Sequence, residues 1–373
     1  MTPEELAAHY TRFRVTERVL LTGHSHQAWP DVAFDGQRAA IEDAAEFVDE
    51  KWDRAAAKAE RVRDGVRVLL GEPRADVALG GSTHDLVVRF LSALDLRGRP
   101  RLVTTTGEFH TLRRQLDRLG EAGIEVVRVD AEPVATLAER MAHAVDEFSA
   151  AALVSSVLFA SGRIVAGLPW LARACEQRGT ELLVDAYHQF GAVPFDLGGL
   201  EGAWIVGGGY KYLQLGEGNC FLRLPPHAQH LRPVVTGWFA EFEGLAATPS
   251  SATAYATGGD RFAGATYDPT SHYRAGAVFD FFAAHGLTDH VLRGISLRQT
   301  TLIAERLGLE EPREQFGGFV AITTPRAAEL RDALRAEGVH TDYRGDVLRL
   351  GPAPYVTYDQ LHRALDVLTG MMR

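Results

Sequence analysis

The sequence predicts an α/β protein with a mostly parallel sheet, helices on both of its faces, and a smaller α+β unit at the C-terminal end. Apolar strands alternate with helical segments from about residue 75 to residue 209, which is typical of a covered parallel sheet. After about Pro225 a long polar segment rich in glycine and aromatic residues follows, and loops of this length are often functional. From residue 317 onward the pattern indicates a strand, a helix, two strands and a helix.

In chain order, a short first helix is expected because Thr2 and Glu5 form a capping box and Pro3 takes the first helical position. Residues 18–30 predict a strand that breaks into a loop, and residues 31–70 predict helix. Further strands are expected at 75–80, 101–107, 124–130, 151–159, 180–191 and 202–209, and helices at 80–94, 110–123, 134–145 and 168–179. The C-terminal part predicts helices at 275–286, 296–308, 327–338 and 358–372, and strands at 317–324, 339–344 and 347–352.

Composition and charge exclude several classes of function. The 373 residues are 46% hydrophobic and 24% charged, as in an ordinary globular protein, and the net charge of -10 argues against a nucleic-acid partner. Two cysteines, Cys175 and Cys220, predict neither a disulfide framework nor a metal site, so no metal is expected. The N-terminal residues show no signal core and no apolar run would cross a membrane. We expect a cytoplasmic protein without a membrane partner.

An acid and an amine follow two successive predicted strands. Asp185 stands near the end of the strand at 180–191, and Lys211 comes directly after the strand at 202–209. Ligands of α/β sheets bind at the carboxyl ends of such strands, so the pair could share a cofactor. The alternative is an ion pair or two solvated charges. The glycines around Lys211, at 207–209, 216 and 218, are interpreted as clearing space for a flat ring and a phosphate.

A turn from strand to helix offers a phosphate site. Gly80, Gly81, Ser82 and Thr83 would present backbone amides and hydroxyls at a helix start, although they could be only a tight turn with an N-cap. Phe109, after the strand at 101–107, could stack on a ring or belong to the core. A lysine, an acid and a phosphate cradle on one sheet are what pyridoxal 5′-phosphate requires.

The chain resembles kynureninases, within the class V aminotransferase group of fold-type-I pyridoxal-phosphate enzymes. The stretches that carry the resemblance are "VDAYHQFGAVPFDL" at 184–197, "GGGYKYLQLGEG" at 207–218, "TGWFAEFEG" at 236–244, "RGDVLRLGPAPYVTYDQL" at 344–361 and, more loosely, "LTGHSHQAWP" at 21–30. The resemblance implies a seven-stranded type of sheet in a large cofactor-binding domain at 21–265. It further implies a small domain at 266–373, packed against an N-terminal segment at 1–20.

The resemblance also implies roles for single residues. Lys211 would bind the cofactor as a Schiff base, Asp185 would meet the pyridine nitrogen, and His188 would lie beside the ring oxygen or the acid. Further cofactor contacts would come from Ser82, Thr83, Phe109, Ser155 and Tyr210, and across a dimer interface from Trp238 and Thr266. Substrate contacts would come from Arg349, His24 and Ser25, with Arg349 holding a carboxylate through its planar fork. Without the motif, Arg349 would be a surface salt bridge.

The chain departs from the family pattern in two places. The Phe-Pro-Thr-Asp segment appears as Phe109 to Leu112, without its acid, and His24 and His26 replace an asparagine and an apolar residue. His24 could line the pocket or belong only to a loop.

The reaction that the resemblance implies is hydrolytic cleavage of a kynurenine-like amino acid to an alanine product, with Tyr210 as acid or base. Alternatives are transamination, racemisation or elimination on the same cofactor, or a catalytically silent relative. A homodimer with shared active sites is expected from the family.

Overall fold

The computed structural model of the chain describes residues 1–244 and 252–372. Its centre is a seven-stranded sheet with the order β2-β8-β7-β6-β5-β3-β4. The strands are β2 (Asp76–Gly80), β3 (Arg101–Thr105), β4 (Glu125–Val129), β5 (Ser149–Ser155), β6 (Glu181–Asp185), β7 (Trp204–Gly208) and β8 (Cys220–Leu224). The five neighbouring strands β4, β3, β5, β6 and β7 are all parallel to one another, whereas β8 runs antiparallel to both β7 and β2. The predicted α/β class with a mostly parallel sheet is confirmed.

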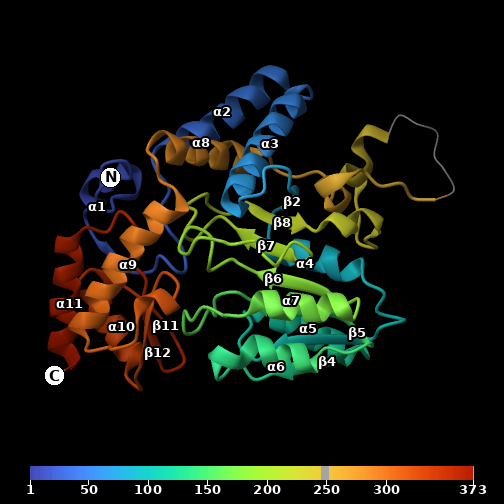
Figure 1. Cartoon of the computed structure of the whole chain (residues 1–373). Helices are drawn as coiled ribbons and strands as arrows, with labels where there is room; N and C mark the ends of the chain where they lie inside the picture. The colour runs from blue at the N-terminus through green and yellow to red at the C-terminus, as the bar shows by residue number, and fades with distance from the viewer. Residues whose placement is uncertain (245–251, 373) are drawn as a thin grey trace.

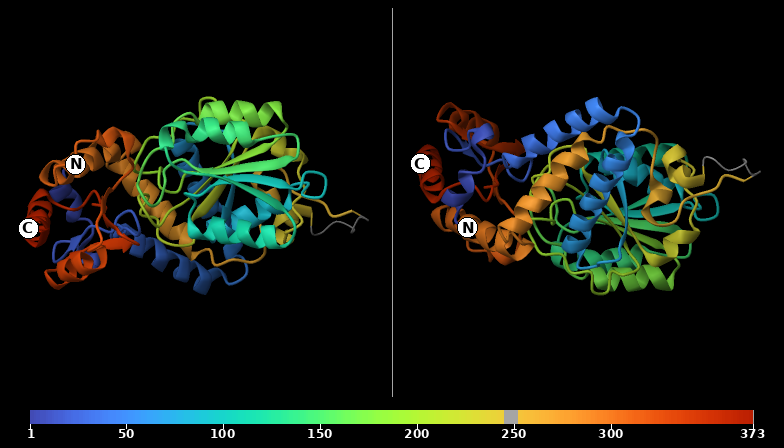
Figure 2. Two further views of the ribbon diagram at one scale, coloured as in Figure 1. Left: turned by 90° about the horizontal axis from the view of Figure 1, so that it is seen from below. Right: turned by 90° about the horizontal axis from the view of Figure 1, so that it is seen from above.

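Helices cover both faces of this sheet (Figure 1 and Figure 2). Helices α4 (Thr83–Ser92) and α5 (His110–Glu121) share one apolar cluster, and α3 (Lys51–Leu70), α6 (Leu137–Ala144) and α7 (Leu168–Gln177) share the other. Within β6, Leu182 and Val184 belong to one cluster and Leu183 to the other, as the alternation of side chains along a strand requires. The sheet is therefore buried on both faces, so a ligand can reach its strands only at their ends.

The N-terminal part begins with α1 (Pro3–Ala7), whose capping box between Thr2 and Glu5 is present as predicted. The predicted helical stretch at 31–70 is two helices, α2 (Val32–Phe47) and α3. Val48 ends the first of them with a φ of 49°, a value outside the helical region. Helix α8 (Thr270–Ala284) packs against both α2 and α3 (Figure 1).

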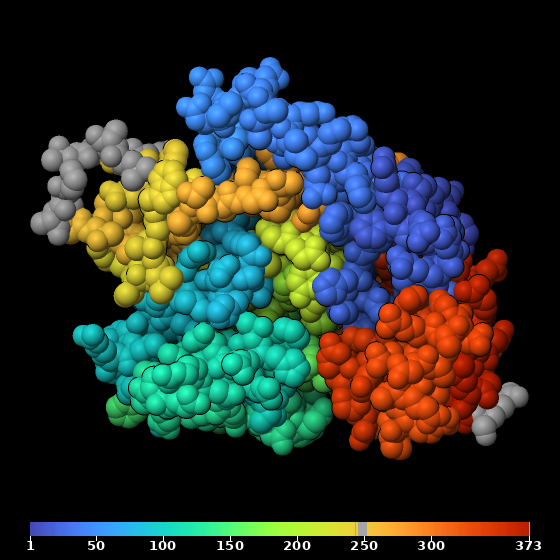
Figure 3. Space-filling view, turned by 180° about the vertical axis from the view of Figure 1, so that it is seen from behind, coloured from blue at the N-terminus to red at the C-terminus, as the bar shows by residue number. Residues whose placement is uncertain are grey.

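The C-terminal unit is a small α+β structure. It contains α9 (Asp289–Arg306), β9 (Val320–Thr323), α10 (Ala327–Ala336), β10 (Val339–His340), β11 (Asp342–Arg344), β12 (Val347–Leu350) and α11 (Tyr358–Met372). Strands β11, β12 and β9 form an antiparallel sheet, and β1 (Val19–Leu20) pairs with β10. The first residues, dark blue in Figure 3, accordingly lie against the last ones, in orange and red. Exact domain boundaries stay a prediction.

Some elements differ from those expected. Strand β8 was not expected, and it holds the end of β7 by antiparallel pairing. Strand β6 ends at Asp185 rather than continuing to residue 191, because residues 186–192 form turns. The long segment after Pro225 contains the short helices η3 (Pro226–His230), η4 (Trp238–Gly244) and η5 (Gly258–Phe262), while its residues 245–251 lie outside the described part. None of the helices in the described ranges is long and apolar enough to cross a membrane.

Candidate active site

The predicted lysine, acid and histidine meet at the carboxyl ends of β6 and β7. Strand β6 ends at Asp185, and β7 ends at Gly208, shortly before Lys211. The amine of Lys211 lies 2.8 Å from Nε2 of His188, and only 6% of this lysine is exposed. The carboxylate of Asp185 accepts a hydrogen bond from the backbone N–H of Tyr187, which fixes the turn after the strand. A buried amine thus faces a buried imidazole beside a half-buried acid.

Burial changes the protonation of all three groups. It lowers the pKa of Lys211 to about 8, with Asp185 opposing the shift and the cation of Arg349 reinforcing it. The pKa of His188 falls well below its usual value for the same reason, so its imidazole is neutral and its Nε2 can accept a hydrogen bond from the lysine amine. Burial raises the pKa of Asp185. Lys211 is therefore partly an unprotonated amine near neutral pH, the form that reacts with a carbonyl group.

Aromatic rings surround the lysine amine. The ring centres of Phe109, Tyr187 and Tyr210 lie 5.4, 4.6 and 5.7 Å from its Nζ. A small cavity is lined by Thr83, Phe109 and Asp185 together. An amine, an acid, an aromatic ring and a hydroxyl therefore converge, which is the donor set that pyridoxal phosphate needs. Tyr187 was missed by sequence reasoning, although its place between Asp185 and His188 could have indicated it.

The glycines before Lys211 do not have the role expected of them. A Cβ at Gly208 would lie 2.4 Å from the ring of Tyr187, and one at Gly207 would lie 2.6 Å from the ring of Phe221. At Gly209 it would meet Leu215 at 2.6 Å. The space is thus filled by side chains of the protein itself, so the interpretation as open room for a ring and phosphate is wrong for these three glycines. Their effect on a ligand is indirect, through the placing of Tyr187.

The predicted phosphate turn has the geometry of an N-cap. Ser82 accepts a hydrogen bond from the backbone N–H of Asp85 at 3.1 Å, and Thr83 is the first residue of α4. A Cβ at Gly81 would meet only the Asp85 carboxylate, at 3.7 Å. The hydroxyl protons of Ser82 and Thr83 remain available as donors. The turn therefore fits both the N-cap and the phosphate site that the sequence left open.

Arg349 lies in an ion pair rather than at the surface. Its Nε donates to Asp342 at 2.9 Å, its Nη2 donates to the other oxygen of the same carboxylate, and its Nη1 donates to the carbonyl of Phe159 at 2.7 Å. His24 donates from Nε2 to Asp342 at 2.7 Å, with a pKa lowered by burial to about 4. A guanidinium has five N–H groups, so two of Arg349 stay available for a substrate carboxylate.

Phe319 lies between the group formed by His24 and Arg349 and the histidine beside Lys211. Its ring centre lies 4.7 Å from that of His24, 6.1 Å from that of His188 and 5.7 Å from the guanidinium of Arg349. It is fully buried just before β9. The sequence offered only an apolar residue after two glycines, so Phe319 was missed. It brings the predicted substrate residues of the C-terminal unit next to those of the large sheet.

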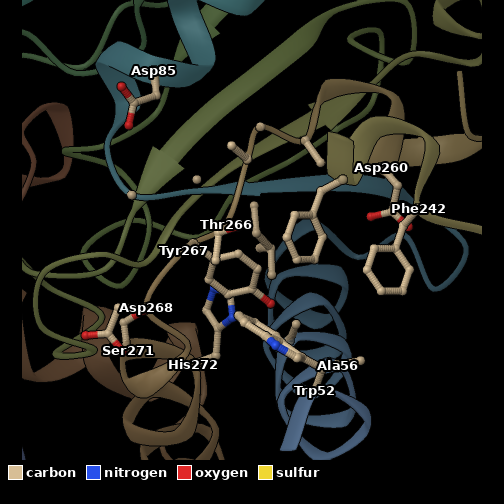
Figure 4. A pocket seen from close by; sticks show the side chains of 18 of the residues that line it. Trp52, Ala56, Asp85, Phe242, Asp260, Thr266, Tyr267, Asp268, Ser271 and His272 are labelled. Carbon is tan, nitrogen blue, oxygen red and sulfur yellow. The ribbon is translucent and has the colours of Figure 1, made fainter. Parts of the chain in front are cut away.

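Of the remaining predicted residues, Ser155 lies beside Asp185, whereas Ser25, Trp238 and Thr266 make contacts away from Lys211. Ser155 is at the end of β5, where it pairs in register with Asp185. Ser25 contacts the neighbouring His26. Trp238 donates to the hydroxyl of Thr266 at 3.2 Å. Thr266 lines a larger cavity of about 1210 Å³, which also contains Trp52, Phe239, Phe242, Tyr267 and His272 (Figure 4). Among the described residues, no hydrogen bond or ring contact links Trp238 with Lys211.

The fold defines the class of protein first. The chain superposes with a TM-score of 0.83 on a C-DES variant described with glycine covalently linked to its PLP cofactor, at 15% identity over 97% of this chain and 98% of that one. It matches a cysteine desulfurase from Thermococcus onnurineus NA1 with the same TM-score, at 14% identity over 100% and 98%. The chain thus has the fold of the fold-type-I pyridoxal-phosphate enzymes, as predicted.

Relatives in sequence narrow the class. The kynureninase from Pseudomonas fluorescens is 27% identical over 98% of this chain and 92% of its own length. The uncharacterized aminotransferase YcbU from Bacillus subtilis is 28% identical over 84% of each. A family model of the kynureninase C-terminal domain matches residues 284–368, which include Asp342 and Arg349. The resemblance to kynureninases and class V aminotransferases is confirmed.

Proposed function

We propose that the chain is a pyridoxal-phosphate-dependent enzyme that cleaves a kynurenine-like amino acid hydrolytically to an alanine product. The cofactor agrees with the comparisons, because the related kynureninases and the PLP-bound structural relative belong to this class of enzyme. One observation carries the proposal. The amine of Lys211 is buried against His188, and its pKa is raised by the charge of Asp185 and lowered by that of Arg349.

The residues around Lys211 would hold the cofactor. When bound, pyridoxal phosphate supplies an aldehyde that reacts with amines and a ring that withdraws electrons. Lys211 would hold the aldehyde carbon, Asp185 would hold the proton on the ring nitrogen, and Phe109 would cover the ring face. Phosphate contacts would come from Ser82, Thr83 and Tyr210. Because burial raises the pKa of Asp185 and lowers that of Lys211, both groups gain from a ligand that pairs with them.

Arg349 and its partners would orient the amino acid. Two N–H groups of Arg349 are available for the α-carboxylate, while Asp342 and the Phe159 carbonyl hold the guanidinium plane. Lys211 would move the proton on Cα, since its pKa near 8 allows it to take and return a proton. Tyr210 would hold the proton needed at the side-chain ketone. Its pKa is raised by burial, so its hydroxyl stays protonated and can donate.

A second candidate is another reaction of the class V group: transamination, elimination or epimerisation of a different amino acid. The similarity to an aminotransferase supports it, as does His24, which replaces an asparagine of the kynureninase pattern. Cysteine desulfuration through a protein thiolate is not favoured. Cys175 and Cys220 are both buried, and burial raises the pKa of each thiol to about 12, so neither is a ready nucleophile.

We further propose a cytoplasmic homodimer with shared active sites. The larger cavity supports the shared site, because it is open, is lined by the aromatic rings of Trp52, Phe239, Phe242 and Tyr267, and adjoins the Gly80–Gly81 turn (Figure 4). Trp238 is 41% exposed. A second copy would cover such rings and could bring Trp238 and Thr266 to the partner's cofactor.

The test combines a label with an assay. The chain has three lysines, Lys51, Lys58 and Lys211, so borohydride reduction of the cofactor-loaded protein followed by peptide mapping should place the label on Lys211 alone. Incubation with kynurenine should release anthranilate and alanine. Lys211→Ala should abolish both results, and Lys58→Ala, on the exposed face of α3, should leave them unchanged.

Different outcomes of this test have different meanings. The absence of a visible absorption band from unreduced wild-type protein loaded with pyridoxal phosphate would refute the cofactor. A band without alanine release from kynurenine would instead support the second candidate. A Lys211→Ala variant with full activity would refute the assignment of this lysine.

A further inference from the structure

Glu108 is a buried carboxylate that the proposed reaction does not use. It follows β3, directly before Phe109, and is 3% exposed. One of its oxygens accepts from the hydroxyl of Thr105 at 2.9 Å and from the backbone N–H of Ser155 at 3.1 Å. The other accepts from the hydroxyl of Ser155 at 2.6 Å. Three hydrogen bonds thus hold this side chain in one place.

The sheet register places this carboxylate close to Asp185. Strand β5 lies between β3 and β6, and Ser155 at its end is paired in register with Asp185. Glu108 therefore binds the residue next to the acid that would meet the ring nitrogen. Phe109, its neighbour in the chain, has its ring on the lysine amine and lines a cavity together with Asp185. Glu108 thus connects the ring-stacking residue with the edge that carries the acid.

A second buried carboxylate beside Asp185 costs free energy, because it loses its hydration and lies near a like charge. Desolvation raises the pKa of Glu108 to about 7, and Asp185 is the charged group that adds to this rise, while Ser155 and Thr105 oppose it. Two carboxylates at one strand edge repel each other in the free protein. A positive charge bound beside Asp185 would relieve this repulsion, and the protonated ring nitrogen of the cofactor is such a charge.

We propose that Glu108 is a positioning residue for the cofactor, which holds Ser155 beside Asp185 and adds a second negative charge next to the ring nitrogen. This inference rests on the proposed cofactor. A purely structural role, in which Glu108 only ties the loop after β3 to β5, would affect folding but neither the affinity for the cofactor nor its charge state.

Glu108→Gln separates these roles, because it removes the charge and keeps the size. Cofactor-free protein is titrated with pyridoxal phosphate, and its Kd is read from the visible absorption band. The variant should bind about tenfold more weakly than the wild type. The pH midpoint of the band should move lower, since loss of a nearby negative charge destabilises the protonated, positively charged form.

Two further variants complete the experiment. Glu108→Asp keeps the charge but shortens the reach to Ser155, so its Kd should rise while its pH midpoint stays nearer the wild-type value. Glu181→Gln is the matched control: this carboxylate lies at the opposite end of β6, bonded to the indole of Trp204 at 2.7 Å, and its loss should change neither quantity. Urea unfolding of each cofactor-free variant reports any purely structural effect.

The outcomes distinguish this inference from the function on which it rests. Absence of a visible band in the wild type refutes the cofactor itself, and the inference with it. A wild-type band combined with a Kd for Glu108→Gln within twofold of the wild type, at an unchanged pH midpoint, overturns the inference alone. Should Glu108→Gln not fold, a Kd for Glu108→Asp within twofold of the wild type overturns it equally.

Discussion

Asp342 binds both His24 and Arg349, so its removal should lower the free energy of unfolding. Its carboxylate accepts from Nε and Nη2 of Arg349 and from Nε2 of His24. Arg349 is 3% exposed, so its guanidinium depends mainly on these partners for its hydrogen bonds. Asp342→Ala would therefore leave a buried guanidinium without its counter-ion and a buried imidazole N–H without an acceptor.

The expected loss follows from these contacts. Removal of one partner from a buried ion pair costs about 3–5 kcal/mol. The side chain of Asp342 is 17% exposed, so water can partly replace it and the lower end of that range applies. The lost hydrogen bond of His24 adds about 1 kcal/mol. We expect Asp342→Ala to lower the free energy of unfolding by about 3–4 kcal/mol, and Asp342→Asn, which keeps one acceptor, by less.

Urea unfolding of the cofactor-free protein measures this loss. Asp346→Ala, at the exposed turn of the same hairpin, is the control and should change the unfolding free energy by less than about 0.5 kcal/mol. His24 and Arg349 together hold the pKa of Asp342 below its usual value, against the opposing effect of burial. Its stabilising effect is thus complete above about pH 4 and is lost as the pH falls further. A loss below about 1 kcal/mol at pH 7 would show that Asp342 is not an essential counter-ion of Arg349.

Two further predictions follow from single contacts. Gly208→Ala should push the ring of Tyr187 away from Lys211, since the new Cβ would lie 2.4 Å from it; thermal unfolding should show a loss of about 1–3 kcal/mol. Gly202→Ala, with nothing within 4 Å, should leave stability unchanged, and equal losses would contradict this explanation. His24 has a pKa of about 4 in the folded protein, compared with 6.5 for a free histidine. The unfolded chain therefore binds a proton here more readily, and stability falls as the pH drops from 6.5 to 4. His24→Asn should reduce this acid-induced loss by about 3 kcal/mol, and an unchanged pH profile of urea unfolding would contradict it.

Local patterns in the sequence determined the class of fold. Alternating apolar strands and helices predicted the covered parallel sheet, because both periodicities are set by the geometry of the backbone within a few residues. The same patterns placed Asp185 and Lys211 at the ends of neighbouring strands, which is where the structure has them. Strand β8 was missed, since a short apolar stretch carries no clear period of its own.

The roles of the glycines could not be read from the chain. Gly208 is small because Tyr187 packs over it, and this contact exists only once β6 and β7 lie side by side. Small residues beside a lysine are compatible with either a ligand or a packed side chain. The choice between them depends on what the neighbouring strand places there.

Residue patterns alone predicted the fold class, the neighbouring positions of Lys211 and Asp185 at the strand ends, and the resemblance from which the cofactor follows. The packing of the whole chain was needed to show that Arg349 is bound to Asp342, that Phe319 contacts both His24 and His188, and that Glu108 binds Ser155 next to Asp185. The physical reason is distance along the chain: His24 and Asp342 are 318 residues apart and meet at 2.7 Å. Such contacts follow from how the sheets and their connecting loops pack, which no local pattern of residues records.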